Sequence, residues 1–469
     1  MTGIPRLLAL AVAIAMGGRS VPAFDLANVL PELGTAPTPP SISEGLRLSY
    51  HVAVATVSGA YVNEFLENAG ANADPELPNP SGRGITQVDV VGVTPQWTAL
   101  RVQPWLFHNF TGPLVPLFGA DECLISHAGG GDWYAHPSVL AKVQTTVQER
   151  LKIIRLPLRL GTTTFDALRV QTDSEAGRQV LCYDLQTGFL IYKAGATDGA
   201  QGATLSQATF IGSRLLTLPW ANRLLPSWAA GLPQLRYEGT YTTVAPGPFP
   251  FSVPLSTELK LTALAPNWFV YDQTTTAGSL EGMPPTVTKR TLVSGIPHLA
   301  GLTLPSPMPA ELTAGRSLDT DPITGATTGI AFVGTLRSGR AGVVIRMNVG
   351  DVAWSETAYD RDTGIAMELY TYSGASPVYY ERSELSLVDL PPEPPTAPRV
   401  ATQLSTDRRF LTLTWPTQTG TTGTLWISLD GARTWSKVPE ATDRPGTGQT
   451  MRVEVPLKAA TALYRIGIR

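Results

Sequence analysis

Residues that could bind a metal or move a proton gather in the segment 105–156. Three of the chain's five histidines, His108, His127 and His136, lie there with several carboxylates and three consecutive glycines. A zinc site needs three or four His, Cys or carboxylate ligands at about 2 Å from the metal, and no HExxH or CxxC spacing organises them here. Three interpretations stay open: surface or structural histidines, a metal site at His108, His127 and His136, or acid–base catalysis. Because His136 directly precedes Pro137, it could equally mark the start of a helix.

Other catalytic motifs are missing from the sequence. It contains no Gly-x-Ser-x-Gly elbow, no phosphate-binding glycine loop and no dinucleotide fingerprint. The sequence therefore predicts no cofactor and leans against an enzyme. A pair of carboxylates for glycoside hydrolysis meets in space without a fixed spacing in sequence, so a secreted glycan hydrolase stays open as an alternative. Because the basic residues form no stripe interleaved with aromatic residues, we expect no nucleic-acid partner.

The N-terminus predicts export. Arg6 precedes an uncharged run over residues 7–18, and Val21-Pro22-Ala23 offers the small residues of a cleavage site. Together these features resemble a secretory signal peptide over residues 1–23. A transmembrane helix needs roughly 20 apolar residues, and no later segment approaches that length, so we expect no membrane span after cleavage. The mature protein is expected to be extracytoplasmic: secreted, periplasmic or on the surface of a bacterium.

Two cysteines, Cys123 and Cys182, remain after that cleavage. An oxidising compartment would let them pair, and a loop of this size would add roughly 4 kcal/mol of stability in the chain-entropy model. We predict a disulfide between them. Two buried free thiols are the alternative, because a sequence does not give the distance between two side chains.

A repeated turn organises the elements that would position these residues. Tyr183-Asp184-Leu185-Gln186-Thr187-Gly188 returns as Tyr359-Asp360-Arg361-Asp362-Thr363-Gly364, between strand-like runs in both places. Asp184 and Asp360 can bond the backbone ahead of them, and Gly188 and Gly364 can take positive φ, which favours a hairpin turn closed by a glycine. A second landmark, Pro95-Gln96-Trp97, returns as Pro266-Asn267-Trp268 in the same order. The sequence therefore predicts a duplicated unit.

Composition predicts a mainly β protein. The 469 residues include 44 Gly and 40 Pro, and only 16% are charged, so turns are frequent and long polar helices are scarce. We expect two tandem antiparallel β units, duplicated and half-barrel or sandwich-like, followed by a small β-sandwich. The expected divisions are a Pro/Ala-rich arm at 24–44, the β units at 45–225 and 232–390, a Pro-rich linker at 391–398 and the sandwich at 399–469. The first unit is expected to hold one main helix after Pro137, from the apolar spacing between Val139 and Leu151, and a short helix at 61–66.

The C-terminal segment resembles a fibronectin type III-like or other immunoglobulin-like module. Leu411-Thr412-Leu413-Thr414-Trp415-Pro416 is similar to an early core strand of that family, and Leu463-Tyr464-Arg465-Ile466 to a late one. Ser428-Leu429-Asp430-Gly431-Ala432-Arg433-Thr434-Trp435 resembles an Asp-box with its second glycine replaced. Such a box implies structure and no reaction, and we interpret Asp430 and Gly431 as a two-residue hairpin turn.

The duplicated units resemble the half-barrels of bacterial periplasmic lipoprotein carriers, through the strands that end in Tyr-Asp-x-x-Thr-Gly hairpins. That resemblance implies an apolar groove in each unit, with Trp97, Trp105, Trp133 and Trp268 as candidate lining residues; the alternative is that these tryptophans fill the core. The leading hypothesis is a non-enzymatic binding or structural protein, and a carrier of a lipid or other apolar ligand is the alternative. Expected partners are a cell-surface protein, a polysaccharide or an apolar ligand.

Overall fold

The structure is a computed structural model, and the chain divides into two compact units, Met1–Pro391 and Pro392–Arg469. It describes residues 26–468 except the segments 70–76, 78–79, 108–113, 175–176, 200–201, 245–250, 279–284, 300, 307, 310, 377–378, 392–400, 406–409, 418–421, 429–435 and 457–462. The predicted signal peptide, the turn at Asp430 and Gly431 and nearly all of the predicted linker lie outside the described residues. Among the helices that are described, none has the length and apolar character needed to cross a membrane.

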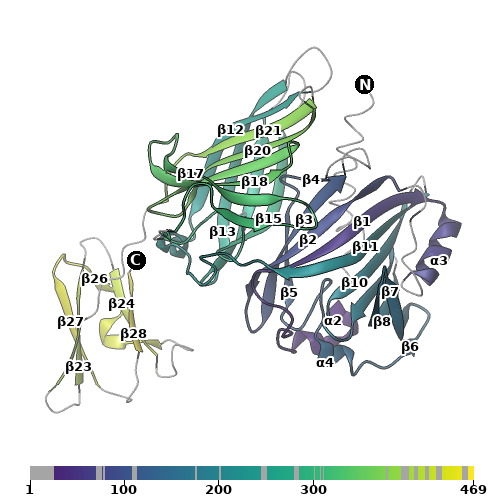
Figure 1. The fold of residues 1–469 in the computed structure, drawn as a ribbon. Helices are drawn as coiled ribbons and strands as arrows, with labels where there is room; N and C mark the ends of the chain where they lie inside the picture. Colours follow the sequence, from purple (N-terminus) through teal and green to yellow (C-terminus); the bar gives the residue numbers. More distant parts are fainter. Residues whose placement is uncertain are drawn as a thin grey trace. The chain divides into compact units, whose positions relative to one another are not determined.

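The first β unit is an eleven-stranded antiparallel sheet (Figure 1). Its strand order is β4-β3-β2-β1-β11-β10-β9-β8-β7-β6, and β5 also pairs with β3. The strands are β1 (Leu46–Val57), β2 (Gly82–Val93), β3 (Trp97–Phe107), β4 (Leu114–Pro116), β5 (Glu122–His127), β6 (Thr146–Val147), β7 (Leu151–Leu160), β8 (Thr163–Ser174), β9 (Gly177–Asp184), β10 (Leu190–Gly199) and β11 (Gly202–Leu215).

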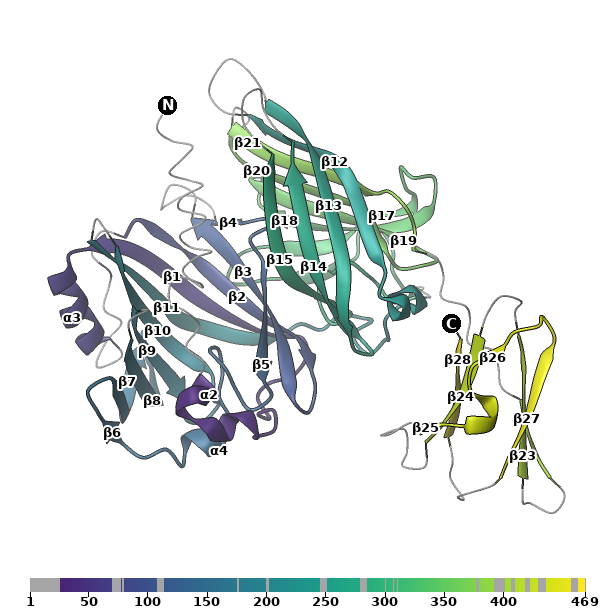
Figure 2. The ribbon, with the colours of Figure 1, turned by 180° about the vertical axis from the view of Figure 1, so that it is seen from behind.

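The second β unit is a ten-stranded antiparallel sheet, seen from behind in Figure 2. Its order is β15-β14-β13-β12-β21-β20-β19-β18-β17-β16. The strands are β12 (Gln234–Val244), β13 (Phe251–Leu264), β14 (Trp268–Ala277), β15 (Thr286–Gly295), β16 (Ser317–Thr320), β17 (Thr327–Thr335), β18 (Ala341–Val349), β19 (Ala353–Asp360), β20 (Ala366–Ser376) and β21 (Tyr379–Leu387).

The two sheets have one topology. In each, the first strand lies in the middle, between the second and the last, and the other strands follow outward in chain order. Pro95 lies between β2 and β3 as Pro266 lies between β13 and β14. Even the irregularities agree, because the β2–β3 ladder shifts register after Val90 and the β13–β14 ladder shifts after Leu261, at matching positions. The fold is thus the mainly β, duplicated architecture that the sequence predicts.

The Tyr-Asp turn has the same hydrogen bonds in both copies. A carboxylate oxygen of Asp184 accepts from the backbone N–H and the hydroxyl of Thr187, at 2.9 and 2.6 Å, and Asp360 does the same for Thr363 at 2.9 and 2.7 Å. Gly364 has φ of 70°, and Gly188 has φ of 78°, in the left-handed region that glycine adopts at little cost. The turn chemistry predicted for both copies is confirmed.

The segment after β5 in the first unit has a counterpart in the second. The N–H of Ala135 donates to the carbonyl of Gly188 at 2.8 Å, and the N–H of Leu304 donates to the carbonyl of Gly364 at 2.8 Å. In the first unit, the loop after β5, which pairs with β3, returns over the turn. In the second unit, the loop after β15, which pairs with β14, does the same. The glycine at the turn leaves room for that loop, because a Cβ on Gly364 would lie 2.2 Å from the Leu304 carbonyl oxygen.

Short helices complete the first unit: α2 (Leu26–Val29), the 3-10 helix η1 (Pro31–Gly34), α3 (Gly59–Asn68) and α4 (Pro137–Leu140). The segment 24–44 is therefore more than the expected arm, since Leu26, Leu30 and Leu33 are buried in the core of the first sheet. The predicted short helix at 61–66 lies within α3. The predicted helix from Val139 to Leu151 is wrong beyond Leu140, because β6 and the start of β7 occupy its second half.

The helices distinguish the two faces of the first sheet. We call the face that packs against α2, η1 and α4 the inner face; it carries Leu48 and Tyr50 of β1. The opposite, outer face carries small residues where α3 packs on it, among them Ala53, Ala194 and Ala196. In the second sheet we call the face that carries Tyr237 the inner face, and the 3-10 helix η3 (Ser227–Gly231) packs on it. The indole N–H of Trp228, in η3, donates to the Thr363 carbonyl at 2.9 Å.

The C-terminal unit contains two small sheets, β22-β23-β27 and β25-β24-β26, with β28 paired to β24. The elements are β22 (Ala401–Leu404), β23 (Phe410–Pro416), β24 (Thr422–Ser428), β25 (Ser436–Lys437), η4 (Pro439–Ala441), β26 (Arg444–Pro445), β27 (Thr450–Pro456) and β28 (Leu463–Ile468). Trp415 and Leu413 from one sheet and Leu425 from the other form a shared core, as in a small β-sandwich. The fibronectin type III-like resemblance stays a prediction.

Candidate functional site

The inner face of the first sheet carries a hollow above its core. The register of β1 sets its lining, because Val52 pairs with Ala208 of β11 and Val54 pairs with Ser206. Ala208 in turn pairs with Lys193 of β10. Cross-strand neighbours on one face lie about 5 Å apart, so this row of small and branched side chains forms a continuous surface across three strands.

Trp133, which lines the hollow, belongs to a cluster of aromatic rings. Trp133, from the loop after β5, lies 4.8 Å from the ring of Tyr50, measured between centroids, and Phe210 lies 5.7 Å from Tyr50. Tyr50 is fully buried, and its hydroxyl has no hydrogen-bond partner among the residues that the structure describes. Burial raises the pKa of that hydroxyl well above its usual value, so Tyr50 stays neutral and offers one donor in an apolar setting.

The hollow is a pocket with about 650 Å³ of empty space, part of which is open to solvent. Thr86, Val102, Pro104 and Glu122 close its side toward β2, β3 and β5, and the remaining lining residues are Val52, Ala53, Val54, Ala120, Trp133, Lys193, Ser206, Gln207 and Ala208. Protein interiors are otherwise packed as densely as organic crystals. An apolar hollow with a few polar groups at its margin is the usual form of a small-molecule site.

Two charged side chains lie at the margin of this pocket. Lys193 Nζ is 3.5 Å from a carboxylate oxygen of Asp132 and 5.7 Å from the centroid of the Trp133 ring. Glu122 reaches the opposite margin from β5, where it pairs with Val102 of β3. A ligand in the pocket would therefore meet apolar walls along its body and charged or polar groups at its ends.

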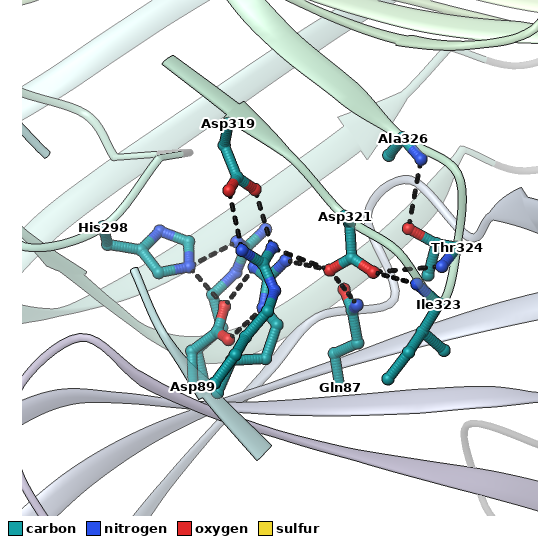
Figure 3. Close-up of polar contacts among 11 residues, drawn as sticks. Gln87, Asp89, His298, Asp319, Asp321, Ile323, Thr324 and Ala326 are labelled. Carbon is teal, nitrogen blue, oxygen red and sulfur yellow. Dashed lines mark hydrogen bonds and ion pairs between the residues drawn. The ribbon is translucent and has the colours of Figure 1, made fainter. Parts of the chain in front are cut away.

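A second cluster, the inter-unit network, joins the outer face of the first sheet to the second unit (Figure 3). Arg47 Nε and Nη2 donate to the two carboxylate oxygens of Asp89 at 2.6 and 2.9 Å, and its Nη1 donates to Asp321 at 3.0 Å. Arg214 donates to both oxygens of Asp319 at 2.7 Å and to Asp321 at 2.9 Å. Asp321 thus holds two arginines of the first unit from a loop of the second.

His298 and Asp89 occupy the other side of the inter-unit network. Nε2 of His298 lies 2.7 Å from Oδ2 of Asp89 and 3.0 Å from Nη1 of Arg101. Burial and the Arg101 charge lower the pKa of His298, so the ring is neutral at neutral pH. Burial opposes the charge of Asp89, but Arg47 and His298 outweigh it and hold the pKa of Asp89 far below its usual value.

The inter-unit network connects the first β unit to the second. Arg47, Asp89, His298 and Asp321 are each at least nine-tenths buried, which keeps them from any substrate in solvent. Burial opposes the charge of Asp321, but the Thr324 N–H and the arginines keep its pKa far below the usual value. We interpret the cluster as a buried ionic joint between the two β units. Sequence analysis missed it, because its members lie up to 274 residues apart.

The four tryptophans proposed as groove lining do not share one groove. Trp133 lines the pocket, but Trp105 is buried in a separate cluster with Ile85 and Leu114. Trp97 and Trp268, which match in the two copies, pack edge to face at 4.7 Å where the units meet. Of the four tryptophans, Trp133 lines the pocket, Trp105 and Trp268 are buried in cores, and Trp97 is partly buried against Trp268.

The predicted metal site is not assembled from the residues that can be seen. His108 lies outside the described residues. His127 ends β5, where it pairs with Trp97, while Nδ1 of His136 accepts from the Ser138 N–H at 3.1 Å and caps α4. Across the described part of the chain, no group of three His, Cys, Asp or Glu side chains could hold a metal ion.

The predicted disulfide is wrong, because Cys123 and Cys182 are both free thiols. Cys123 on β5 packs beside the Trp97–Trp268 contact, whereas Cys182 on β9 lies under α3. Five strands separate β5 from β9 in the sheet. Burial raises the pKa of each thiol to about 12, which makes both poor nucleophiles.

Comparison with known proteins does not assign the chain to a family. No family model and no curated protein matches it. Among solved structures, a protein of unknown function from the DUF3598 family of Nostoc punctiforme is 13% identical, with a TM-score of 0.12, over 74% of this chain and 96% of that one. PNGF-II is 7% identical, with a TM-score of 0.15, over 91% of this chain and 96% of that one. Neither likeness is close enough to carry an argument about function.

Proposed function

We propose that the chain is an exported binding protein whose first β unit holds a small, mainly apolar molecule in the inner-face pocket. The observation that carries this proposal is the largely apolar hollow above an otherwise packed core, whose empty space of about 650 Å³ includes space open to solvent. Empty space of this kind forfeits contacts that side chains would make. Ala208 and Ser206 keep it open, since larger residues at these positions would fill it.

The chemistry of the walls indicates the class of ligand. Val52, Val54 and Trp133 offer apolar surface, and Lys193 offers a cation at the margin. Each CH₂ group transferred from water to such a surface contributes about 0.8 kcal/mol, and a carboxylate or similar acidic head would pair with Lys193. The ligand that fits is therefore a compact amphiphile with one acidic end.

The test uses anilinonaphthalene sulfonate, a compact aromatic probe with one acidic group. We expect its fluorescence to rise on saturable binding to the full chain, with energy transfer from Trp133. Ser206→Leu places a bulkier side chain in the pocket and should weaken binding at least about tenfold, the equivalent of 1.4 kcal/mol. Thr204→Leu is the matched control, because Thr204 lies two residues earlier on the same strand and outside the pocket lining.

Two results would count against the pocket. The first is non-saturable binding by the unmodified chain, and the second is equal affinity in the Ser206→Leu and Thr204→Leu variants. Lys193→Met tests the contribution of the probe's acidic group. It should lower the affinity for the sulfonate probe more than the affinity for the uncharged analogue anilinonaphthalene.

Export is part of the same proposal and rests on the signal peptide-like residues 1–23. Expression of the full chain in a bacterium, followed by fractionation and N-terminal sequencing, should yield a product outside the cytoplasm that begins at Phe24. An intact N-terminus in the cytoplasmic fraction would refute this part and leave the pocket untouched.

A further inference from the structure

The outer face of the second sheet carries a long open groove. It consists of two hollows across β19, β20, β21 and β12, with about 450 and 800 Å³ of empty space, including space open to solvent. The hollows share Tyr370 and Glu384, so they form one continuous surface. We call it the outer groove.

Comparison of the two units shows how the outer groove arises. The Tyr-Asp turns align β10 with β20, so that Ala194 and Ala196 of the first unit match Tyr370 and Tyr372 of the second. In the first unit those alanines are buried under α3. In the second unit the matching tyrosines are only half-buried and line the groove. The same face is thus a core covered by a helix in the first unit and an accessible aromatic surface in the second.

The aromatic rings form a row across neighbouring strands. Trp354 pairs with Tyr372 in the sheet, and their ring centroids are 5.9 Å apart with an angle of 14° between the planes. Tyr380 continues the row at 5.6 Å from Tyr372. At the other end, the Arg346 guanidinium lies 4.7 Å from the Trp354 ring centroid. Aromatic side chains of this kind give apolar contact area while their polar atoms still face water.

Polar groups of both signs surround the row. Glu368 is 5% exposed, and its carboxylate accepts from the Tyr370 hydroxyl at 3.0 Å and from the Ser338 N–H at 3.2 Å. Glu384 lies 3.9 Å from Arg382 on the same strand. Because both donors and acceptors line the outer groove and the charges are partly paired, it offers many hydrogen bonds without a strong field of either sign.

These features discriminate between classes of ligand. A nucleic acid or another polyanion needs a basic surface, whereas carboxylates are prominent in this groove. A peptide that binds by strand addition needs an open sheet edge, and the groove crosses four strands that are paired with one another. A neutral, hydroxyl-rich ligand gains from the carboxylates as acceptors, from arginine, serine and threonine as donors, and from the rings as apolar contacts.

We propose that the outer groove binds a neutral polysaccharide, with Trp354, Tyr372 and Tyr370 as the contact residues. Four strands at about 4.8 Å spacing give the groove a length of roughly 14 Å, which suits several sugar units of a chain better than a single sugar. This site is separate from the inner-face pocket and does not depend on the function proposed for it.

The test is affinity electrophoresis of the full chain through native gels that contain hydroxyethylcellulose, xyloglucan, galactomannan or soluble starch, with alginate as an anionic comparison. We expect at least one neutral polysaccharide to retard the protein. Trp354→Ala and Tyr372→Ala should each weaken that retardation about tenfold or more, as expected for loss of an aromatic contact worth about 1.4 kcal/mol. Tyr372→Phe keeps the ring and should retain most of the affinity.

Controls keep the result interpretable. Phe332→Ala removes an exposed aromatic ring of the same unit outside the groove and should change nothing. Arg382→Ala alters an exposed groove residue with little risk to folding, and we expect a loss of a few fold. The inference is overturned if no neutral polysaccharide retards the chain, if only alginate does, or if folded groove variants bind like the unmodified protein.

Discussion

Replacing Asp89 with Asn should destabilise the unit Met1–Pro391 by about 3–5 kcal/mol. Asp89 is 1% exposed and accepts two hydrogen bonds from Arg47, at 2.6 and 2.9 Å, beside the 2.7 Å contact to His298. An amide keeps one acceptor, but it turns an N–H₂ group toward a buried guanidinium and removes the opposing charge. Breaking a buried ion pair from one side typically costs this much, because the remaining buried charge loses its main partner.

A matched control lies in the same inter-unit network. Asp319 also forms two hydrogen bonds to one arginine, at 2.7 Å each, but its side chain is 14% exposed and Arg214 keeps Asp321 as a second partner. We therefore expect Asp319→Asn to cost only about 1 kcal/mol. Arg47 and Arg214 both keep Asp321 as a second partner, and both variants change a carboxylate to an amide, so the comparison isolates burial.

The assay is urea unfolding of the full chain, followed by tryptophan fluorescence. The data are fitted with one transition for Met1–Pro391 and one for Pro392–Arg469. In an Arg47→Met background, Asp89→Asn should cost much less than in the unmodified protein, because its main partner is already gone. If Asp89→Asn and Asp319→Asn differ by less than 1 kcal/mol, or if the two changes at Arg47 and Asp89 are additive, the buried Arg47–Asp89 pair does not stabilise the fold as described.

Three further outcomes follow from the fold. Gly364→Ala should destabilise the second unit by about 1–3 kcal/mol or more, measured by thermal unfolding, because its φ of 70° is strained for alanine and the new Cβ would lie 2.2 Å from a backbone oxygen. The free energy of unfolding should fall as pH drops below about 4, by up to about 1.4 kcal/mol per pH unit for each of Asp89 and Asp321, because their folded pKa values lie below the unfolded value near 3.9; a flat profile between pH 4 and 2 would contradict the ionic joint. Cys182, which is buried, should react with a thiol reagent only after denaturation, and a mass spectrum of the unreduced protein that shows a disulfide between Cys123 and Cys182 would contradict the structure.

Local chemistry made the turns and the duplication predictable. The hydrogen bonds of Asp184 and Asp360 and the positive φ of Gly188 and Gly364 depend on residues adjacent in the chain, so they can be inferred from sequence. The prediction of a helix up to Leu151 was wrong because local spacing did not decide the structure there. Its apolar spacing is ambiguous over a short run, and pairing of β6 with β7 decided the outcome through contacts that the segment itself does not encode.

The sites depend on long-range geometry and were harder to predict. Arg47 and Asp321 meet across 274 residues, and nothing in their local sequence indicates a partner. One signal was present, since Asp89 interrupts the apolar run Val88-Asp89-Val90, and a charge within a strand of that kind is usually paired. The pocket was missed because small residues such as Ala208 shape it by what they leave unfilled, which no motif records.

A crystal structure of the full chain soaked with an iodinated alkyl carboxylate would show whether the inner-face pocket takes a compact acidic amphiphile. We expect an anomalous iodine peak between Val52, Ala208 and Trp133, with the carboxylate beside Lys193. A pocket that stays free of iodine at saturating probe, while peaks appear only elsewhere on the protein, would contradict that expectation.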